Sequence, residues 1–266
     1  MDNKKITLVY EALSPMSHGG DETLSNISPF RRSKMNLKNK IIDLPVITGN
    51  SVRGIWRRLG MLELLKMIEL EKESLSISTY HLLFTGGSLT ASAEDTQTLR
   101  KREIRNIMPF LSVFGSAIVN DMLAGKLSSG ILYPISNETE EITGISSDKS
   151  IYEFISTEFY TRRDDFEEDE KSTTNQMIYE SEVLIVGTKF QQNIMLKNVT
   201  ELEKGAFLHM LEVFSKNCVV GGKDNVGHGR MKFEYDFELE RDSINHYLDY
   251  IKENKEKIKE YILNKL

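Results

Sequence analysis

The chain has 266 residues, of which 39% are hydrophobic and 28% charged, the composition of a globular protein with an ordinary core. Its formal net charge of −6 argues against a surface that is basic throughout, so any nucleic-acid site must be a local positive stripe. Cys218 is the only cysteine, which excludes an intrachain disulfide and favours a reducing compartment. Because we find neither a membrane-spanning apolar run nor a leader peptide, we expect a cytoplasmic protein without a membrane partner.

The first element in chain order is a strand, predicted over residues 5–12 from the alternation of apolar and polar side chains. A turn with two glycines follows at 17–21. A second, short strand at 46–47 ends in a glycine turn that opens a helix. Asn50 and Ser51 are the two candidates for the N-cap of this helix, because their side-chain oxygens can accept from free amides of the first turn.

The predicted helix has an apolar face and a basic face. Apolar residues recur at helical spacing and are expected to face the core, namely Val52, Ile55, Trp56 and Leu59. Three arginines fall on or beside the opposite face, namely Arg53, Arg57 and Arg58. Free amides at a helix N-terminus, with arginines one turn further on, suit a phosphodiester backbone. An ordinary amphipathic helix with solvated arginines is the alternative.

The rest of the chain alternates between helical and extended patterns. The first helix is predicted to continue to about Lys72, since no helix breaker follows Gly60. Further helices are predicted over 96–105, 107–123, 201–216 and 242–265, and further strands over 130–135, 182–196 and 231–239.

This order of elements predicts an α+β fold, with a split βαβ, ferredoxin-like or RRM-type sheet at its centre. We expect one domain over residues 1–266, with insertions at about 68–106 and 137–180 and a C-terminal helix at about 242–265.

A glycine-rich segment at 219–233 lies between the helix over 201–216 and the last strand, and it contains four glycines. Glycine at this density allows backbone amides to approach a bound anion. The candidates to bind phosphate are Gly222, Lys223, His228 and Arg230. A β-turn that merely closes a hairpin explains the glycines equally well. The arginine-bearing helix at 50–59 favours the anion-binding interpretation.

These segments together resemble the RAMP superfamily of CRISPR effector proteins. Within it, they resemble most the backbone subunit (the Cas-seven type) of type IV complexes. The most specific pieces are Gly-Asn-Ser-Val-Arg-Gly at 49–54 and Gly-His-Gly-Arg at 227–230. Three more stretches follow the family's order, namely 6–12 with the turn after it, 109–116 and 180–190. The resemblance covers most of the chain, except 68–105 and the residues beyond Leu239.

The resemblance implies a subunit that polymerises head-to-tail along a guide (CRISPR) RNA. This subunit would present the guide for pairing with target DNA or RNA, together with other CRISPR effector subunits. RNA would lie across the helix face, held by the glycine loops, while a thumb hairpin at about 160–180 spaces the bases. The residues that the resemblance implies bind RNA are His18, Gly19, Gly20, Arg31, Arg32, Asn50, Ser51, Arg53, Arg57, Arg58, Arg162, Arg163, Lys189, Gly222, Lys223, His228 and Arg230.

At the thumb, Met177 or Ile178 would wedge between bases. Residues 164–176 are strongly acidic, so we expect only the base of the hairpin to touch RNA. The acidic tip is then either an ordinary surface loop or a contact to a basic patch on the next subunit.

No catalytic site is expected. Type III relatives that cut their target have an Asp shortly before a Pro and an Arg in the loop after the first strand. Here residues 26–32 have no carboxylate at that place, and Asp21 is the only nearby substitute. A lone Asp is weak evidence for acid–base or metal chemistry, and the five histidines show no metal-ligand spacing. We therefore expect a protein that is not an enzyme and has no metal or cofactor.

Two catalytic alternatives stay open at this point. One is a type III-like backbone subunit that cleaves target RNA through Asp21. The other is a RAMP-fold endoribonuclease that processes the guide precursor with His18 as its general base.

Overall fold

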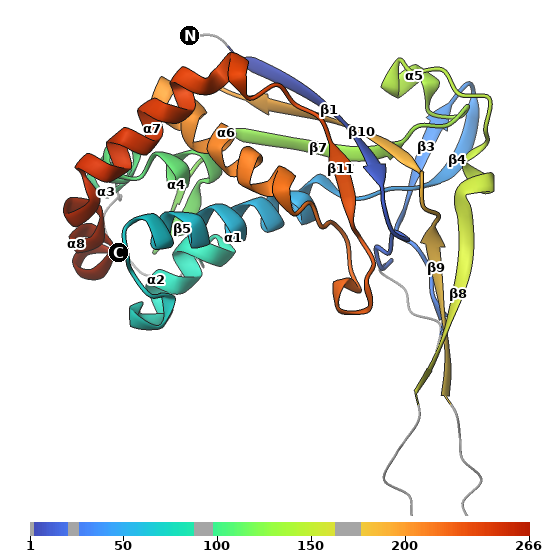
Figure 1. Cartoon of the computed structure of the whole chain (residues 1–266), viewed down its shortest axis with the longest axis horizontal. Coiled ribbons are helices and arrows are strands. Elements are labelled where there is room, and N and C mark those ends of the chain that lie inside the picture. Colours follow the sequence, from blue (N-terminus) through green and yellow to red (C-terminus); the bar gives the residue numbers. More distant parts are fainter. Residues whose placement is uncertain (1–2, 21–26, 88–97, 163–176) are drawn as a thin grey trace, which may run out of the picture.

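A four-stranded antiparallel sheet is the centre of the computed structural model of the chain (Figure 1). The structure describes residues 3–20, 27–87, 98–162 and 177–266, and only the backbone at positions 161, 162 and 177. The sheet has the order β11-β1-β10-β7, and each pair of neighbours is antiparallel. Its strands are β1 (Lys4–Ala12), β7 (Leu127–Pro134), β10 (Lys189–Leu196) and β11 (Met231–Phe233).

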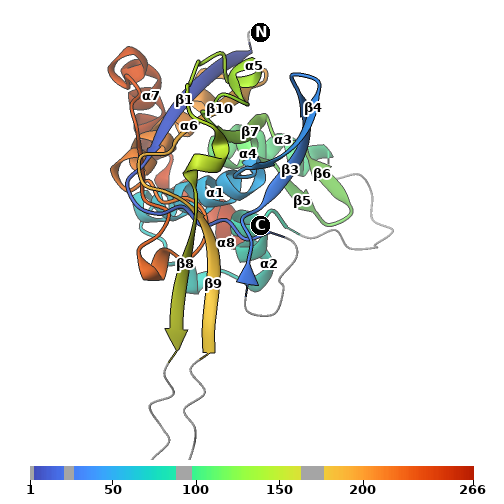
Figure 2. The same ribbon diagram turned by 90° about the vertical axis from the view of Figure 1, so that its right-hand side faces the viewer.

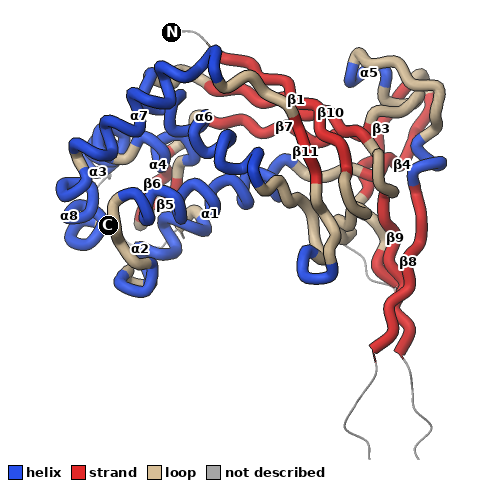
Figure 3. Tube along the Cα trace, in the orientation of Figure 1, coloured by secondary structure: helices blue, strands red, loops and turns tan. Residues whose placement is uncertain are grey.

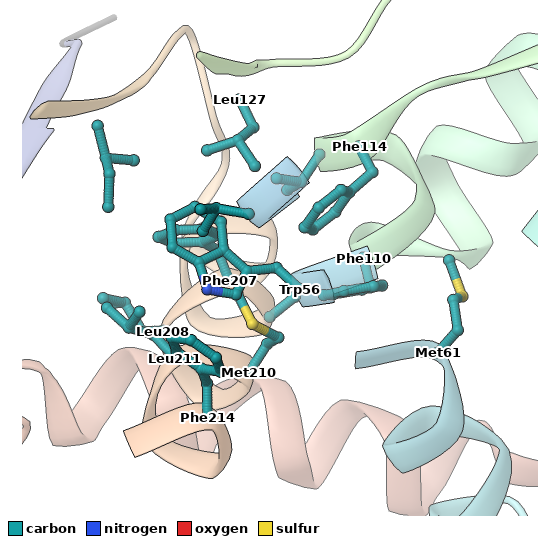
Figure 4. Close-up of a cluster of buried hydrophobic side chains, with 14 of the residues drawn as sticks. Trp56, Met61, Phe110, Phe114, Leu127, Phe207, Leu208, Met210, Leu211 and Phe214 are labelled. Carbon is teal, nitrogen blue, oxygen red and sulfur yellow. The ribbon is translucent and has the colours of Figure 1, made fainter. Parts of the chain in front are cut away.

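Two helices cover one face of this sheet, α1 (Gly49–Met67) and α6 (Glu201–Lys216) (Figure 1). Strand β1 shows why, because Ile6, Leu8 and Tyr10 alternate onto that face and are all buried. The helices meet at Trp56 of α1, whose ring packs edge-on against Phe207 and Phe214 of α6 at centroid distances of 5.7 and 6.1 Å (Figure 4). The sheet and both helices therefore share one core.

Further helices and strands flank this core, and Figure 3 shows most of the helices on one side of the molecule and the strands β3, β4, β8 and β9 on the other. The remaining helices are α2 (Ile77–Tyr80), α3 (Thr98–Ile107), α4 (Pro109–Phe114), α5 (Glu140–Thr143), α7 (Arg241–Glu253) and α8 (Lys255–Lys265). The remaining strands are β2 (Ile27–Ser28), β3 (Arg32–Leu37), β4 (Lys40–Pro45), β5 (Ser116–Ile118), β6 (Asp121–Leu123), β8 (Ile155–Arg162) and β9 (Met177–Leu184). The 3₁₀ turns are Lys72–Ser74, Ile151–Phe154, Asp224–Val226 and Glu238–Glu240, and one π-turn spans His81–Thr85.

Strands β8 and β9 form a hairpin that projects away from the rest of the molecule (Figure 2). Its register runs from Ile155 opposite Leu184 to Arg162 opposite Met177. Strand β2 pairs with β9 in parallel and supports the base of the hairpin. A hairpin therefore lies where the sequence predicts one, and its first strand begins at Ile155 rather than near residue 160.

Helix α1 begins and ends earlier than predicted. Thr48 is its N-cap, with Oγ1 accepting from the Ser51 amide at 3.3 Å, so neither Asn50 nor Ser51 has that role. The helix ends at Met67 rather than near Lys72 because Glu69 takes a left-handed conformation with φ of 52°.

The other corrections concern predicted elements that the structure divides or shortens. The segment 107–123 is not one helix, because Pro109 starts a new helix and Gly115, with φ of 67°, ends it before the β5–β6 hairpin. The segment 182–196 divides into β9 and β10 at a turn with Gly187, whose φ is 82°. The last strand ends at Phe233 rather than residue 239, and Asn254 separates α7 from α8.

Candidate nucleic-acid interface

The glycine-rich loop packs on the loop that follows β1. The Gly222 amide donates to the Ser17 carbonyl at 2.7 Å, and the Gly229 amide donates to the Pro15 carbonyl at 3.0 Å. Gly221 has φ of 96°, and a Cβ there would lie 2.3 Å from the Ser17 carbonyl oxygen. Only glycine fits at this close approach. Two segments that lie about 200 residues apart in the chain therefore form one surface.

His18 joins this surface to the start of α1. Its Nε2 accepts from the Thr48 amide at 3.4 Å, and its ring lies edge-on to Phe30 at 6.2 Å. The Arg31 amide donates to the His18 carbonyl at 2.7 Å, and the Gly20 amide donates to the Pro29 carbonyl at 3.0 Å. The predicted residues at 18–20, the backbone at Arg31 and the first turn of α1 are thus brought together.

The N-terminal half of α1 lines a cleft of about 620 Å³. All five predicted residues of this helix contribute to its lining, namely Asn50, Ser51, Arg53, Arg57 and Arg58. The opposite walls come from the segments 84–86, 114–116 and 122–125. None of the lining residues is acidic, which makes the cleft locally positive in a chain of net negative charge.

Arg57 is buried, with 5% of its surface exposed, so its predicted place on the outer face of α1 is wrong. Its guanidinium donates to the carbonyls of Leu83 (3.3 Å), Phe114 (3.1 Å) and Gly115 (2.6 Å). It also lies over the Phe114 ring, 5.5 Å from the centroid. Burial and the neighbouring Arg53 lower the pKa of Arg57 to about 10, so it is still protonated at neutral pH. Arg57 therefore fixes the backbone at Leu83 and at Phe114–Gly115 against α1.

The other two arginines of α1 differ in how accessible their guanidinium groups are to a ligand. Arg53 also donates to the Phe114 carbonyl, and burial lowers its pKa. Arg58 is exposed, and its side chain makes no hydrogen bond or ion pair within the part of the chain that the structure describes. Arg58 is therefore the arginine of this cleft that is most accessible to an anion.

Lys223 and His228 point from the glycine-rich loop to the hairpin rather than to solvent. Lys223 Nζ lies 4.5 Å from the centroid of the Tyr160 ring, on strand β8. His228 is 5% exposed, and its Nε2 lies 2.7 Å from the Tyr160 hydroxyl and 2.9 Å from Glu158 Oε2. The Tyr160 hydroxyl donates to Glu158 at 2.7 Å. Burial, the hydrogen bond to Glu158 and its charge raise the pKa of Tyr160 well above its usual range.

The remaining predicted residues are spread around these contacts. Arg230 and Lys189 are exposed, and their side chains make no hydrogen bond or ion pair with other described residues. Arg32 pairs with Glu182 of β9, and Ile178 of β9 is 48% exposed. Arg162 and Met177 lie at the outer end of the hairpin, where only the backbone is described, while Arg163 and Asp21 lie outside the described residues.

The described residues contain no group of three or more His, Cys, Asp or Glu side chains placed to hold a metal ion. Within the same ranges, no helix has the length and apolar character needed to span a membrane.

Sequence reasoning missed two parts of this surface. One is the contact of Tyr160 and Glu158 with the glycine-rich loop, and the other is the wall that Tyr80 and Phe84 give to the cleft. A tyrosine in a strand carries no signal for a partner 68 residues away. The segment of Tyr80 and Phe84 lies in an insertion without a recognised motif.

The comparison with known families decides which proteins this chain is related to. A model of the RAMP superfamily matches residues 9–232. The chain belongs to the RAMP superfamily. The RAMP match includes the loop after β1, helix α1, the hairpin and most of the glycine-rich segment, and it stops before α7 and α8.

A solved chain from a "Type IV-B CRISPR Complex" has a fold similar to that of this RAMP protein, with a TM-score of 0.68 and 21% sequence identity. The similarity covers 87% of this chain and 90% of that one. None of the curated proteins matches the sequence.

Proposed function

We propose that this RAMP-superfamily protein is the backbone subunit of a CRISPR effector complex, most like those of type IV, and that it binds the guide RNA. The observation that carries the proposal is the surface on which the loop after β1, the first turn of α1 and the glycine-rich loop meet. Arg230 adds an exposed cation on the glycine-rich loop, and Arg58 adds one in the cleft beside α1. Such a surface suits an RNA backbone, because it combines close backbone approach with accessible guanidinium groups.

The order of elements supports the same assignment. Strands β1, β7, β10 and β11, with α1 after the first and α6 after the third, follow the β-α-β-β-α-β sequence of a ferredoxin-like core. In space the fourth strand lies beside the first, then come the third and the second, all antiparallel. We therefore interpret the central sheet as the ferredoxin-like palm of a RAMP protein, and the projecting β8–β9 hairpin as its thumb.

A subunit that coats RNA must contact further copies of itself head-to-tail, which makes an open filament. The projecting hairpin suits such a contact, because it extends beyond the body of the subunit (Figure 2). The other proposed partners are further CRISPR effector subunits and a complementary target DNA or RNA. We propose that the subunit presents the guide for pairing and does not itself cleave, since Ile27 stands where cleaving relatives have an Asp.

Size measurements with guide RNAs of increasing length test the assembly. Light scattering after gel filtration should show particles whose mass rises in steps with RNA length. A one-to-one complex at every RNA length would contradict the proposal.

A charge-matched pair of double variants tests the surface. Arg58→Ala with Arg230→Ala should weaken single-stranded RNA binding of the monomer and lower the slope of log K against log salt by about 0.7 per lost phosphate contact. Lys252→Ala with Lys257→Ala removes the same charge from exposed positions of α7 and α8 and should leave both quantities unchanged. Equal effects of the two double variants would show that the binding is not local to this surface.

A further inference from the structure

The cleft beside α1 has a wall that comes from the insertion, and the proposed function assigns no role to this wall. It is formed by Tyr80, Phe84, Thr85 and Gly86, from the end of α2 and the π-turn that follows it. The volume of about 620 Å³ lies in the range of roughly 300–1,000 Å³ that small-molecule sites occupy. The cleft is therefore large enough for one nucleotide.

The charges of the residues that line the cleft favour an anionic ligand. Arg53, Arg57 and Arg58 all line the cleft, and none of its lining residues is Asp or Glu. The chain as a whole has 40 acidic residues against 34 Lys and Arg, so this lining departs from the composition of the protein. Because Arg53 and Arg57 bond to backbone carbonyls, the exposed Arg58 is the group that a phosphate can approach directly.

The aromatic wall of the cleft favours a ligand with a flat ring that can stack on it. Tyr80 is 39% exposed and stacks on Phe84 with a centroid distance of 4.8 Å and an interplanar angle of 24°. Phe84 is buried, with 4% exposed, and fixes one face of the Tyr80 ring. A nucleobase stacks on such a ring whatever its identity, because every base has a π-face.

The backbone that carries this wall is held firmly against the core. Arg57 donates to the Leu83 carbonyl, the Ser116 hydroxyl donates to the Leu82 carbonyl at 2.9 Å, and the Ala117 amide donates to the Gly86 carbonyl at 2.8 Å. Tyr80 is thus placed before a ligand arrives, which lowers the entropy lost on binding.

We propose that this cleft binds one unpaired nucleotide of a single-stranded nucleic acid, with its base stacked on Tyr80 and its phosphate at Arg58. The base must be unpaired and unstacked on one side, because a base inside a duplex has neighbours on both faces. The inference rests on the proposed function and adds to it a stacking position that lies outside the glycine loops and the hairpin.

The test compares two short, fluorescently labelled RNA strands of the same length, one of uridine nucleotides and one without bases. With the full chain, Tyr80→Ala should weaken binding of the uridine strand about 5- to 150-fold, the range expected for loss of one stacked base. It should leave the salt slope and the affinity for the abasic strand unchanged, which also shows that the variant is folded. Tyr80→Phe should bind as the unmodified protein does, because it keeps the ring.

Tyr152→Ala is the matched control, since Tyr152 is 60% exposed and does not line the cleft. It should change neither affinity. If the unmodified protein binds the uridine strand and Tyr80→Ala binds it equally well, the stacking inference is wrong while the proposed function stands. If the unmodified protein binds neither strand, the proposed function is wrong and the inference falls with it.

Discussion

Arg57 and Arg58 are neighbours in the chain, yet their environments give them different roles. The guanidinium of Arg57 is surrounded by protein and bonded to three carbonyls, whereas that of Arg58 is exposed beside the cleft. A buried cation of this kind is stable only while its hydrogen bonds are made. Arg57 therefore stabilises the fold, whereas the neighbouring Arg58 is accessible for the RNA contact that we propose.

Arg57→Met should lower the free energy of unfolding by about 2–3 kcal/mol, because the carbonyls of Leu83 and Gly115 lose this donor in a buried place. Urea unfolding can be followed by the fluorescence of Trp56, the only tryptophan, which is fully buried. Arg58→Met is the matched control and should change stability by no more than about 0.5 kcal/mol. Equal losses of stability in both variants would contradict the assignment of Arg57 as a structural residue.

At the scale of elements, the hairpin and the glycine-rich loop are connected through two side chains of β8, Glu158 and Tyr160. Tyr160 donates its single hydroxyl proton to Glu158, so the hydrogen between Tyr160 and His228 belongs to His228 Nε2. Lys223 covers the face of the same ring. The angle at which the hairpin leaves the body of the protein thus depends on a loop that we propose binds RNA.

Tyr160→Ala removes the contacts of this side chain with His228 and Lys223. We expect faster amide hydrogen exchange in β8 and β9 as a result. Exchange in β1 and β10 should be unchanged, because those strands lie in the central sheet. Mass spectrometry of peptides from the hairpin and from the sheet measures the two regions in one experiment. Tyr152→Ala, in the turn just before β8, is the control for loss of a tyrosine near the hairpin. Unchanged exchange in the hairpin of Tyr160→Ala would show that the Tyr160 contacts do not hold it.

The sequence predicts the elements that have a strong period and clear ends. Helix α6 lies at the predicted 201–216, since Thr200 caps it and its apolar residues repeat at helical spacing. The burial of Arg57 was not predictable, because it depends on Leu83 and Phe114, which fold over α1 from later in the chain. The same holds for the aromatic wall of the cleft. Helical period alone predicts that a polar residue beside the core faces solvent. That prediction fails where a later segment of the chain covers the same face of the helix.

At the scale of the whole molecule, the absence of cleavage is the prediction that separates this protein from target-cutting relatives. With guide RNA bound and magnesium present, a complementary target RNA should stay at full length over the time of the assay. Asp21→Ala should give the same result as the unmodified protein, since we assign no chemistry to that carboxylate. Regularly spaced target fragments that vanish in Asp21→Ala would instead place the protein with the cleaving, type III-like subunits. Cutting of a guide precursor would favour the processing endoribonuclease.

The topology of the central sheet has a consequence for how the protein is made in a cell. Strand β1 leaves the ribosome long before its neighbour β10, as the contact between Thr7 and Asn193, 186 residues apart, shows. At a synthesis rate of about 5–20 residues per second, β1 waits roughly 10–40 s for its partner. During that time Ile6, Leu8 and Tyr10 have no sheet to pack into, so the nascent chain offers an apolar strand to chaperones and to other nascent chains. The yield of native protein should therefore depend on translation speed and on chaperone supply.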